Sequence, residues 1–213
     1  MTDLKDVSHI LWDWNGTLLD DAWLCVDIMD TLLLRYGKPG LTPARYQIIF
    51  DFPVRDYYER LGFDFSVTPF EQVGSEFMEE YYRRWRSCSL QAGVETPLRR
   101  FAEQGLPQAI LTAAPSRMVQ AGIDHFAIDS YFRSVNGLDH HYADGKLAVA
   151  RQWLEQAGVR PERVLLIGDT THDYEVASAL GMRCLLISSG HHHADRLRVC
   201  GVPVLSSFDE LRT

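Results

Sequence analysis

Two acidic motifs in this chain have residue types that suit chemistry at a phosphate group. The first spans residues 13–18 and reads DWNGTL. Its carboxylate, Asp13, can act as a nucleophile, Gly16 permits a tight turn beside a bound phosphate, and Thr17 supplies a hydroxyl donor. An Asp-x-Asn-Gly stretch is also an ordinary turn, so this motif alone leaves both interpretations open.

The second motif spans residues 166–173 and reads LIGDTTHD. Asp169 and Asp173 lie four residues apart across a predicted strand-to-helix turn, so their carboxylates can converge on a hard cation that prefers oxygen ligands. Such a metal ion would offset the repulsion between Asp13 and an anionic substrate. The alternative is that Asp169 only caps the helix through its first amides. That alternative weakens because both strand ends carry acids.

Two smaller pieces lie between these motifs. Thr112 ends an apolar run with a hydroxyl, and Ala113 and Ala114 after it leave their backbone amides unobstructed for a phosphoryl oxygen. Lys146, in the sequence ADGKL at 143–147, could supply a cation near both Asp13 and the phosphate. Taken singly, a threonine at a strand end is more often a turn residue, and a lysine at a helix start is more often solvated.

The elements that position these residues follow from short apolar runs alternating with amphipathic stretches. The runs predict buried parallel strands at 9–13, 107–112, 163–169, 183–188 and 202–206. The amphipathic stretches predict helices at 96–104, 146–157 and 171–180, the first and last of which stop at Gly105 and Gly181. Alternating strands and helices predict an α/β fold with a doubly wound parallel sheet, in which ligands bind beyond the carboxyl ends of the strands.

One region interrupts this alternation. Residues 21–87 have helical periodicity without a convincing strand, broken by turn-prone segments at 37–43 and 62–69. We therefore predict a core domain from residues 1–20 and 88–213, and a helical cap domain inserted between them at 21–87.

Composition narrows the functional classes. The 213 residues are 46% hydrophobic, which is ample for a packed core. A formal net charge of -8 argues against a polyanion-binding surface, so we expect no nucleic-acid partner. No run approaches the ~18 apolar residues of a membrane helix, and four widely separated cysteines have no framework spacing. We expect a soluble, cytoplasmic protein with reduced thiols and no membrane partner; its oligomeric state is not indicated.

Taken together and in this order, the motifs resemble the four-motif set of haloacid dehalogenase (HAD) superfamily hydrolases. The resemblance spans the whole chain and is carried by Asp13 with Gly16-Thr17, then Thr112, then Lys146, then Gly168-Asp169 with Asp173. It implies a Rossmann-like, HAD-like core whose first and fourth motif strands are adjacent, with Mg²⁺ between them. The inserted helices resemble the small C1-type cap of phosphoglycolate phosphatase-like and β-phosphoglucomutase-like members.

The resemblance also implies roles for individual residues. Asp13 would be both nucleophile and metal ligand, Asn15 would ligate Mg²⁺ through its backbone carbonyl, and Asp169 would complete the protein ligands. Asp173 would orient the metal or water. The transferring phosphoryl group would be held by Thr112 and Lys146.

Asn15 departs from the family pattern. The family's phosphatases usually have Asp at this position, where it protonates the leaving group and activates water. An amide has no useful proton to exchange, so general acid-base assistance of ~10²- to 10⁴-fold is missing unless another group substitutes. Three hypotheses follow. The protein acts on substrates with good leaving groups, such as acyl phosphates or phosphoanhydrides, or another residue replaces the missing acid, with His172, Asp20 and Asp21 as candidates. In the third, the protein is a slow phosphatase or a binding protein.

The sequence thus predicts a Mg²⁺-dependent phosphatase that acts on a small phosphorylated metabolite through an aspartyl phosphate at Asp13. A phosphomutase on the same scaffold is disfavoured by Asn15, because moving protons between sugar hydroxyls needs an acid-base residue. A carbon-halogen hydrolase is disfavoured because it does not need the second motif's acids. A catalytically weakened phosphometabolite-binding or sensor protein is the alternative from another class.

Two further segments face the predicted cleft. Residues 50–58 are rich in aromatics and contain Arg55, our candidate specificity residue because guanidinium groups bind carboxylates and phosphates in a bidentate manner. The alternative is that this stretch begins a cap helix with its aromatics packed inside. The consecutive histidines His191, His192 and His193 point in different directions in an extended chain and do not predict a zinc site. We expect them to form an exposed loop on the active-site side of the sheet.

Overall fold

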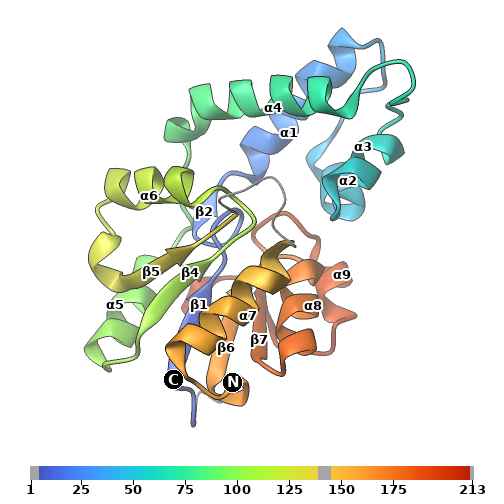
Figure 1. The fold of residues 1–213 in the computed structure, drawn as a ribbon. Helices are drawn as coiled ribbons and strands as arrows, with labels where there is room; N and C mark the ends of the chain where they lie inside the picture. Colours follow the sequence, from blue (N-terminus) through green and yellow to red (C-terminus); the bar gives the residue numbers. More distant parts are fainter. Residues whose placement is uncertain (1–4, 139–144, 212–213) are drawn as a thin grey trace.

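The computed structural model describes residues 5–138 and 145–211, and it centres on a six-stranded sheet whose neighbouring strands are all parallel (Figure 1). Ala143 and Asp144, quoted above beside Lys146, lie outside the described residues. Across the sheet the strands are β5 (Phe132–Asn136), β4 (Gln108–Leu111), β1 (His9–Trp12), β6 (Val164–Gly168), β7 (Arg183–Ile187) and β8 (Val204–Leu205).

Helices cover both faces of this sheet, which explains why its central strands are mostly apolar (Figure 1). Successive residues of β6 alternate between two clusters: Leu165 and Ile167 pack with α5 (Glu95–Glu103) and α6 (Ser116–His125). Val164 and Leu166 pack with helices of the second face, which are α7 (Gly145–Ala157), α8 (Thr171–Leu180) and α9 (Ala194–Arg198). Each fully buried Leu or Ile contributes about 1.5–3 kcal/mol relative to an exposed one.

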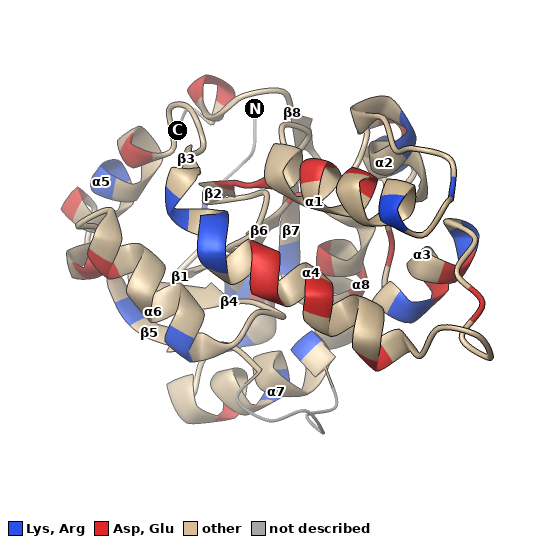
Figure 2. Ribbon diagram, turned by 90° about the horizontal axis from the view of Figure 1, so that it is seen from above, with Lys and Arg blue, Asp and Glu red and all other residues tan. Residues whose placement is uncertain are grey.

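The remaining helices lie beyond the carboxyl edge of the sheet (Figure 1). They are α1 (Ala22–Arg35), α2 (Pro43–Ile49), α3 (Val54–Arg60) and α4 (Phe70–Arg84). The chain enters and leaves this helical layer through a small antiparallel pair, β2 (Leu19–Asp20) with β3 (Ser89–Leu90). Seen from above, acidic residues lie along α4 and its arginines lie in the last turn, which complements the helix dipole (Figure 2).

Short 3₁₀ helices complete the described structure at Trp85–Ser87, Asp129–Tyr131, Pro161–Arg163 and Phe208–Glu210. Among the described residues, no helix combines the length and the apolar character needed to cross a membrane.

The predicted α/β fold with a doubly wound parallel sheet is confirmed, and each of the five predicted strands matches an observed one within a few residues. The adjacency of the first and fourth motif strands is also confirmed, because β1 pairs with β6. The sequence patterns missed α6, the β2–β3 pair and β5. β5 is an edge strand without a fully buried residue, so it lacks the continuous apolar run by which the central strands are recognised.

Candidate active site

Three carboxylates meet at the carboxyl edge of the sheet. Asp13 follows β1 and Asp169 follows β6, and the two strands are paired in register, with Trp12 opposite Ile167. Each carboxylate of Asp13, Asp169 and Asp173 offers an oxygen within 4.8 Å of the other two, and all three side chains are buried. Parallel pairing therefore brings together acids that lie more than 150 residues apart in the sequence.

Lys146 lies between two of these acids. Its Nζ atom is 2.5 Å from Oδ1 of Asp13 and 2.5 Å from Oδ1 of Asp173, and its side chain is 3% exposed. The lysine occupies the first turn of α7, whose N-terminus reaches the same edge of the sheet. The alternative of a solvated lysine is wrong, because two buried carboxylates provide the ammonium group with charged partners that replace water.

Asp173 is held in place by the start of α8. Its Oδ2 atom accepts hydrogen bonds from the amides of Asp169 (3.2 Å) and Thr170 (3.0 Å) and from the Thr170 hydroxyl (2.7 Å). Thr170 is the N-cap and Asp173 completes a capping box, so Asp169 is not the helix cap. Gly168 leaves the room for this arrangement, since a Cβ atom there would lie 2.2 Å from Cγ of Asp173.

Asp169 is oriented by two other donors. Its Oδ1 atom accepts a hydrogen bond from the Thr17 hydroxyl at 2.8 Å, and its Oδ2 atom accepts one from the His191 amide at 2.7 Å. A Cβ atom at Gly16 or at Gly190 would lie 2.2 Å from Oδ2, so both positions need glycine. Thr17 and Gly16 thus position a carboxylate here, and their predicted contacts with phosphate stay predictions.

The electrostatics of the cluster fit a divalent cation. Burial raises the pKa of Asp13 to about 8, against the effect of Lys146, and repulsion from Asp173 and Asp169 adds to the rise. Burial likewise raises the pKa of Asp169 to about 6, opposed by His191. Burial alone would lower the pKa of Lys146, but the two carboxylates raise it, so the lysine stays cationic. Closely spaced, partly uncompensated carboxylate oxygens are the donor set that Mg²⁺ prefers.

Asn15, the residue that departs from the family pattern, is bonded to side chains of the helical layer. Its Nδ2 atom donates to Oδ2 of Asp21 at 2.7 Å and to the hydroxyl of Tyr81 at 2.8 Å. Tyr81, on α4, in turn donates to the same oxygen of Asp21 at 2.6 Å. The sequence named Asp21 as a candidate acid but gave no signal for Tyr81, which lies 60 residues further along the chain.

The expected exposure of the histidine loop is wrong for His191 and His192, which are 4% and 0% exposed. The His191 ring bonds the Tyr46 hydroxyl through Nδ1 (2.7 Å) and lies 3.4 Å from Asp21 Oδ1 through Nε2. Burial lowers its pKa, but the nearby carboxylates, chiefly Asp21, raise it to about 9. The loop is buried because α2 packs against it, a contact that sequence periodicity cannot predict.

His192 has a different environment. Its Nδ1 atom accepts a hydrogen bond from the Thr171 amide at 3.1 Å, while the buried Nε2 atom has no partner among the described residues. Burial, together with repulsion from Arg196, lowers its pKa to about 3. A neutral His192 therefore stabilises the N-terminus of α8 as an acceptor.

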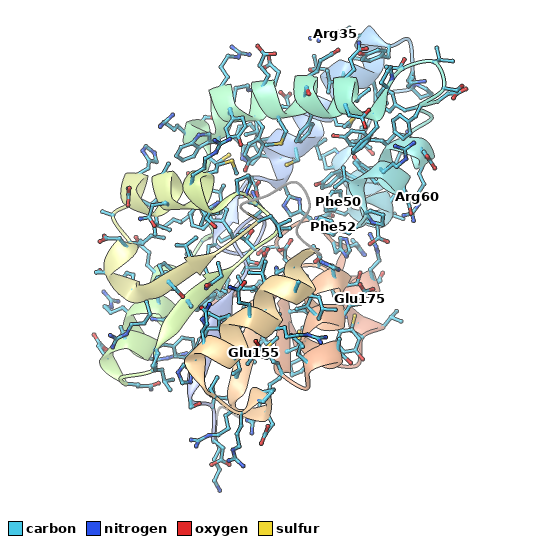
Figure 3. All side chains as sticks on the ribbon, viewed as in Figure 1. Arg35, Phe50, Phe52, Arg60, Glu155 and Glu175 are labelled. Carbon is cyan, nitrogen blue, oxygen red and sulfur yellow. The ribbon has the colours of Figure 1, made fainter. Side chains whose placement is uncertain are left out.

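Aromatic residues between α2 and α3 cover this edge of the core. In Figure 3, Phe50 and Phe52 lie between the helical layer and the α8–α9 side of the core. The Phe50 ring is 5.3 Å from the ring of His191, and the Phe52 ring is 5.0 Å from that of His172. His172 also lies 3.3 Å from Glu175 on α8, and it is not part of the cluster of Asp13, Asp169 and Asp173.

The structure does not bring all predicted residues together. Thr112 directly follows β4, which pairs with β1, and its hydroxyl accepts a hydrogen bond from the Ala114 amide at 3.0 Å, with Ala113 between them. Arg55 contacts the helical layer itself: its guanidinium lies 4.6 Å from the Phe65 ring centroid, and its Nε atom lies 3.7 Å from Glu59. Tyr57 and Tyr58 of this stretch are buried in the helical layer, as the alternative interpretation expected, and a role for Arg55 in specificity stays a prediction.

Comparison with known proteins agrees with this architecture. Residues 10–187 match the family model described as haloacid dehalogenase-like hydrolase. Because the match covers most of the chain, this protein belongs to that family of hydrolases, as the sequence motifs predicted.

Individual relatives have low sequence identity to this chain. A phosphoglycolate phosphatase of Pseudomonas putida is 28% identical over 193 residues, which cover 86% of this chain and 70% of the relative. The tyrosine-protein kinase PtkA of Mycobacterium tuberculosis is 26% identical over 208 residues, covering 95% of this chain and 70% of the relative. Among solved structures, a haloacid dehalogenase-like family protein of Streptococcus pneumoniae superimposes with a TM-score of 0.83 at 18% identity, covering 97% of both chains.

Proposed function

We propose that this hydrolase is a Mg²⁺-dependent phosphatase that acts on a small phosphorylated metabolite through an aspartyl phosphate at Asp13. One observation carries the proposal: three buried carboxylates and one buried lysine converge where β1 and β6 end. A carboxylate in such a position has the right chemistry for a nucleophile, and the surrounding groups provide the charges that a phosphoryl group in transfer requires.

The first chemical step would form a bond between a carboxylate oxygen of Asp13 and phosphorus while the bond to the leaving-group oxygen breaks. Water would then attack the same phosphorus, releasing inorganic phosphate and regenerating the carboxylate. Lys146, already 2.5 Å from Asp13, would stabilise the negative charge of the phosphoryl oxygens in both steps. The hydroxyl of Thr112 and the amide of Ala113, at the end of the neighbouring strand, would hold the transferring group.

The metal ion would be held by Asp13, Asp169 and the backbone carbonyl of Asn15, with Asp173 orienting the metal or its water. When bound, Mg²⁺ would supply positive charge that allows an anionic substrate to approach the carboxylate.

Two features bear on the substrate class, the names of the relatives and the residue type at position 15. The names of the phosphoglycolate phosphatases among the relatives favour a small phosphate monoester. Asn15 favours instead a phosphate whose leaving group needs no proton, and it also favours a second candidate function, a sensor that binds phosphometabolites with little turnover. The division into a core at 1–20 and 88–213 and a cap at 21–87, the cytoplasmic location and the absence of nucleic-acid and membrane partners stay predictions.

Phosphate release from a panel of substrates tests the proposal. The panel contains phosphoglycolate, sugar phosphates, acetyl phosphate and p-nitrophenyl phosphate, each assayed with Mg²⁺ and with EDTA. We expect release from at least one member that requires Mg²⁺ and is lost in Asp13→Asn. Folded protein that binds Mg²⁺ but releases no phosphate from any member would favour the sensor, and turnover that survives Asp13→Asn would refute the nucleophile.

A further inference from the structure

The Asn15 amide group has no hydrogen left to donate. Its two Nδ2 hydrogens have two acceptors, Oδ2 of Asp21 at 2.7 Å and the Tyr81 hydroxyl at 2.8 Å. Only the carbonyl oxygen of this side chain remains to meet a ligand. Toward a ligand, the side chain at position 15 can therefore act only as an acceptor, and this follows from its neighbours as much as from its residue type.

Asp21 in turn has both carboxylate oxygens committed to acceptor roles. Oδ1 accepts a hydrogen bond from the Gly16 amide at 2.8 Å and lies 3.4 Å from Nε2 of His191, while Oδ2 accepts from Asn15 and Tyr81. The side chain is completely buried. It therefore does not reach a substrate itself, and its effect on chemistry has to pass through the residues that it contacts.

We propose that Asp21 is a positioning residue that fixes the Asn15 amide in one orientation, and that positions 15 and 21 form an acid–amide pair in which the buried partner carries the carboxylate. This inference rests on the proposed phosphatase function. It deepens that function, because it assigns the substrate class: phosphates whose leaving groups depart without receiving a proton, such as acyl or aryl phosphates.

The contact between Asn15 and Asp21 explains why position 15 does not hold an acid in this chain. A carboxylate at the half-buried position 15 would lie against the buried carboxylate of Asp21, with acceptors facing acceptors. Like charges at this distance disfavour each other strongly, and the lost donor would leave Asp21 without one of its partners.

The residue types at positions 15 and 21 can be exchanged without a change of side-chain shape. In the double variant Asn15→Asp/Asp21→Asn, the amide introduced at position 21 can keep its oxygen toward the Gly16 amide and turn its nitrogen toward the carboxylate introduced at position 15. Each hydrogen bond of the pair then keeps its partners with the donor and acceptor roles reversed, and the carboxylate moves from the fully buried position to the half-buried one.

The experiment compares wild type, both single variants and the double variant, with Asp27→Asn as a matched control. Asp27 lies on α1 and pairs with Arg84 on the exposed side of the helix, so its substitution removes the same charge without touching Asn15. For each protein, kcat and KM are measured with p-nitrophenyl phosphate, acetyl phosphate and an alkyl phosphate, and thermal midpoints are measured in parallel.

We expect the double variant to raise kcat for the alkyl phosphate at least tenfold over wild type, with little change for acetyl phosphate, while KM values stay within about threefold. The single variant Asn15→Asp is expected to have a lowered thermal midpoint that Asp21→Asn restores, and the control is expected to match wild type.

Two results would overturn the proposal. If the shifts in thermal midpoint of the two single variants add up to the shift of the double variant, the two side chains do not form a pair. If the midpoints are coupled but the double variant keeps the wild-type preference among leaving groups, Asp21 is a structural partner only. Failure of the proposed function is a separate outcome, in which no variant releases phosphate from any substrate. If the thermal midpoints were coupled in that case, Asp21 would pair with Asn15 but would have no positioning role in catalysis.

Discussion

The ammonium nitrogen of Lys146 lies 2.5 Å from a carboxylate oxygen of Asp13, in a pair that is almost completely shielded from water. A buried ion pair that loses one member leaves the other uncompensated, at a cost of about 3–5 kcal/mol. Lys146→Met should therefore lower the free energy of unfolding by about this amount and abolish phosphate release. Urea unfolding and a phosphate assay measure the two effects, with Arg151→Met on the same helix as the exposed control. A Lys146→Met protein of wild-type stability would contradict the buried pair.

Mg²⁺ should stabilise the folded protein. A ligand at a hundred times its Kd adds about 2.7 kcal/mol, equivalent to ~5–10 °C in Tm for a chain of this size. Asp169→Asn, which removes a ligand charge, should abolish this shift, whereas Glu155→Gln should not, because Glu155 is exposed on α7 (Figure 3). Thermal scans with and without Mg²⁺ make the comparison. An undiminished shift in Asp169→Asn would place the ion elsewhere.

Two buried tyrosines of the helical layer should respond to the loss of their hydroxyls with opposite signs. Tyr81 donates to Asp21 at 2.6 Å, so Tyr81→Phe should cost about 1–3 kcal/mol by leaving buried polar atoms without a partner. The buried hydroxyl of Tyr57 has no partner among the described residues, so Tyr57→Phe should be neutral or stabilising. Chemical denaturation of the two variants is the test. Equal destabilisation of both would mean that the hydroxyl of Tyr57 is hydrogen bonded in solution.

His192 should make the folded protein less stable in mild acid. Its pKa is lowered to about 3 in the folded state, against 6.5 ordinarily, so between these values the unfolded chain binds more protons. This contribution to stability is complete above pH 6.5 and is lost as the pH falls, by up to about 1.4 kcal/mol per unit. His192→Asn can keep an acceptor for the Thr171 amide and removes the titration. Urea unfolding from pH 7.5 to 5 should show a shallower decline for this variant; parallel declines would refute the prediction.

The sequence by itself determined five strands of the main sheet, the helices α5, α7 and α8, and the order of the motifs. These features could be predicted because each depends on neighbours in the chain: the apolar run of β6 and the capping residues of α8 are local patterns. Once the sheet is taken as parallel, the meeting of Asp13 with Asp169 follows from the rule that ligand sites lie beyond the carboxyl ends of the strands.

Only the tertiary structure decided how the remaining side chains are used. Three contacts join residues that lie 66 to 145 positions apart in the chain. They are the ion pair that buries Lys146, the bond between Asn15 and Tyr81, and the bond between His191 and Tyr46. A bond between such residues depends on how α2, α4 and α7 pack against the sheet edge, and packing of this kind leaves no periodic trace in the chain. The sequence could thus identify Asn15 as the unusual residue, while its partner Asp21 and the direction of their hydrogen bond emerged only from the folded arrangement.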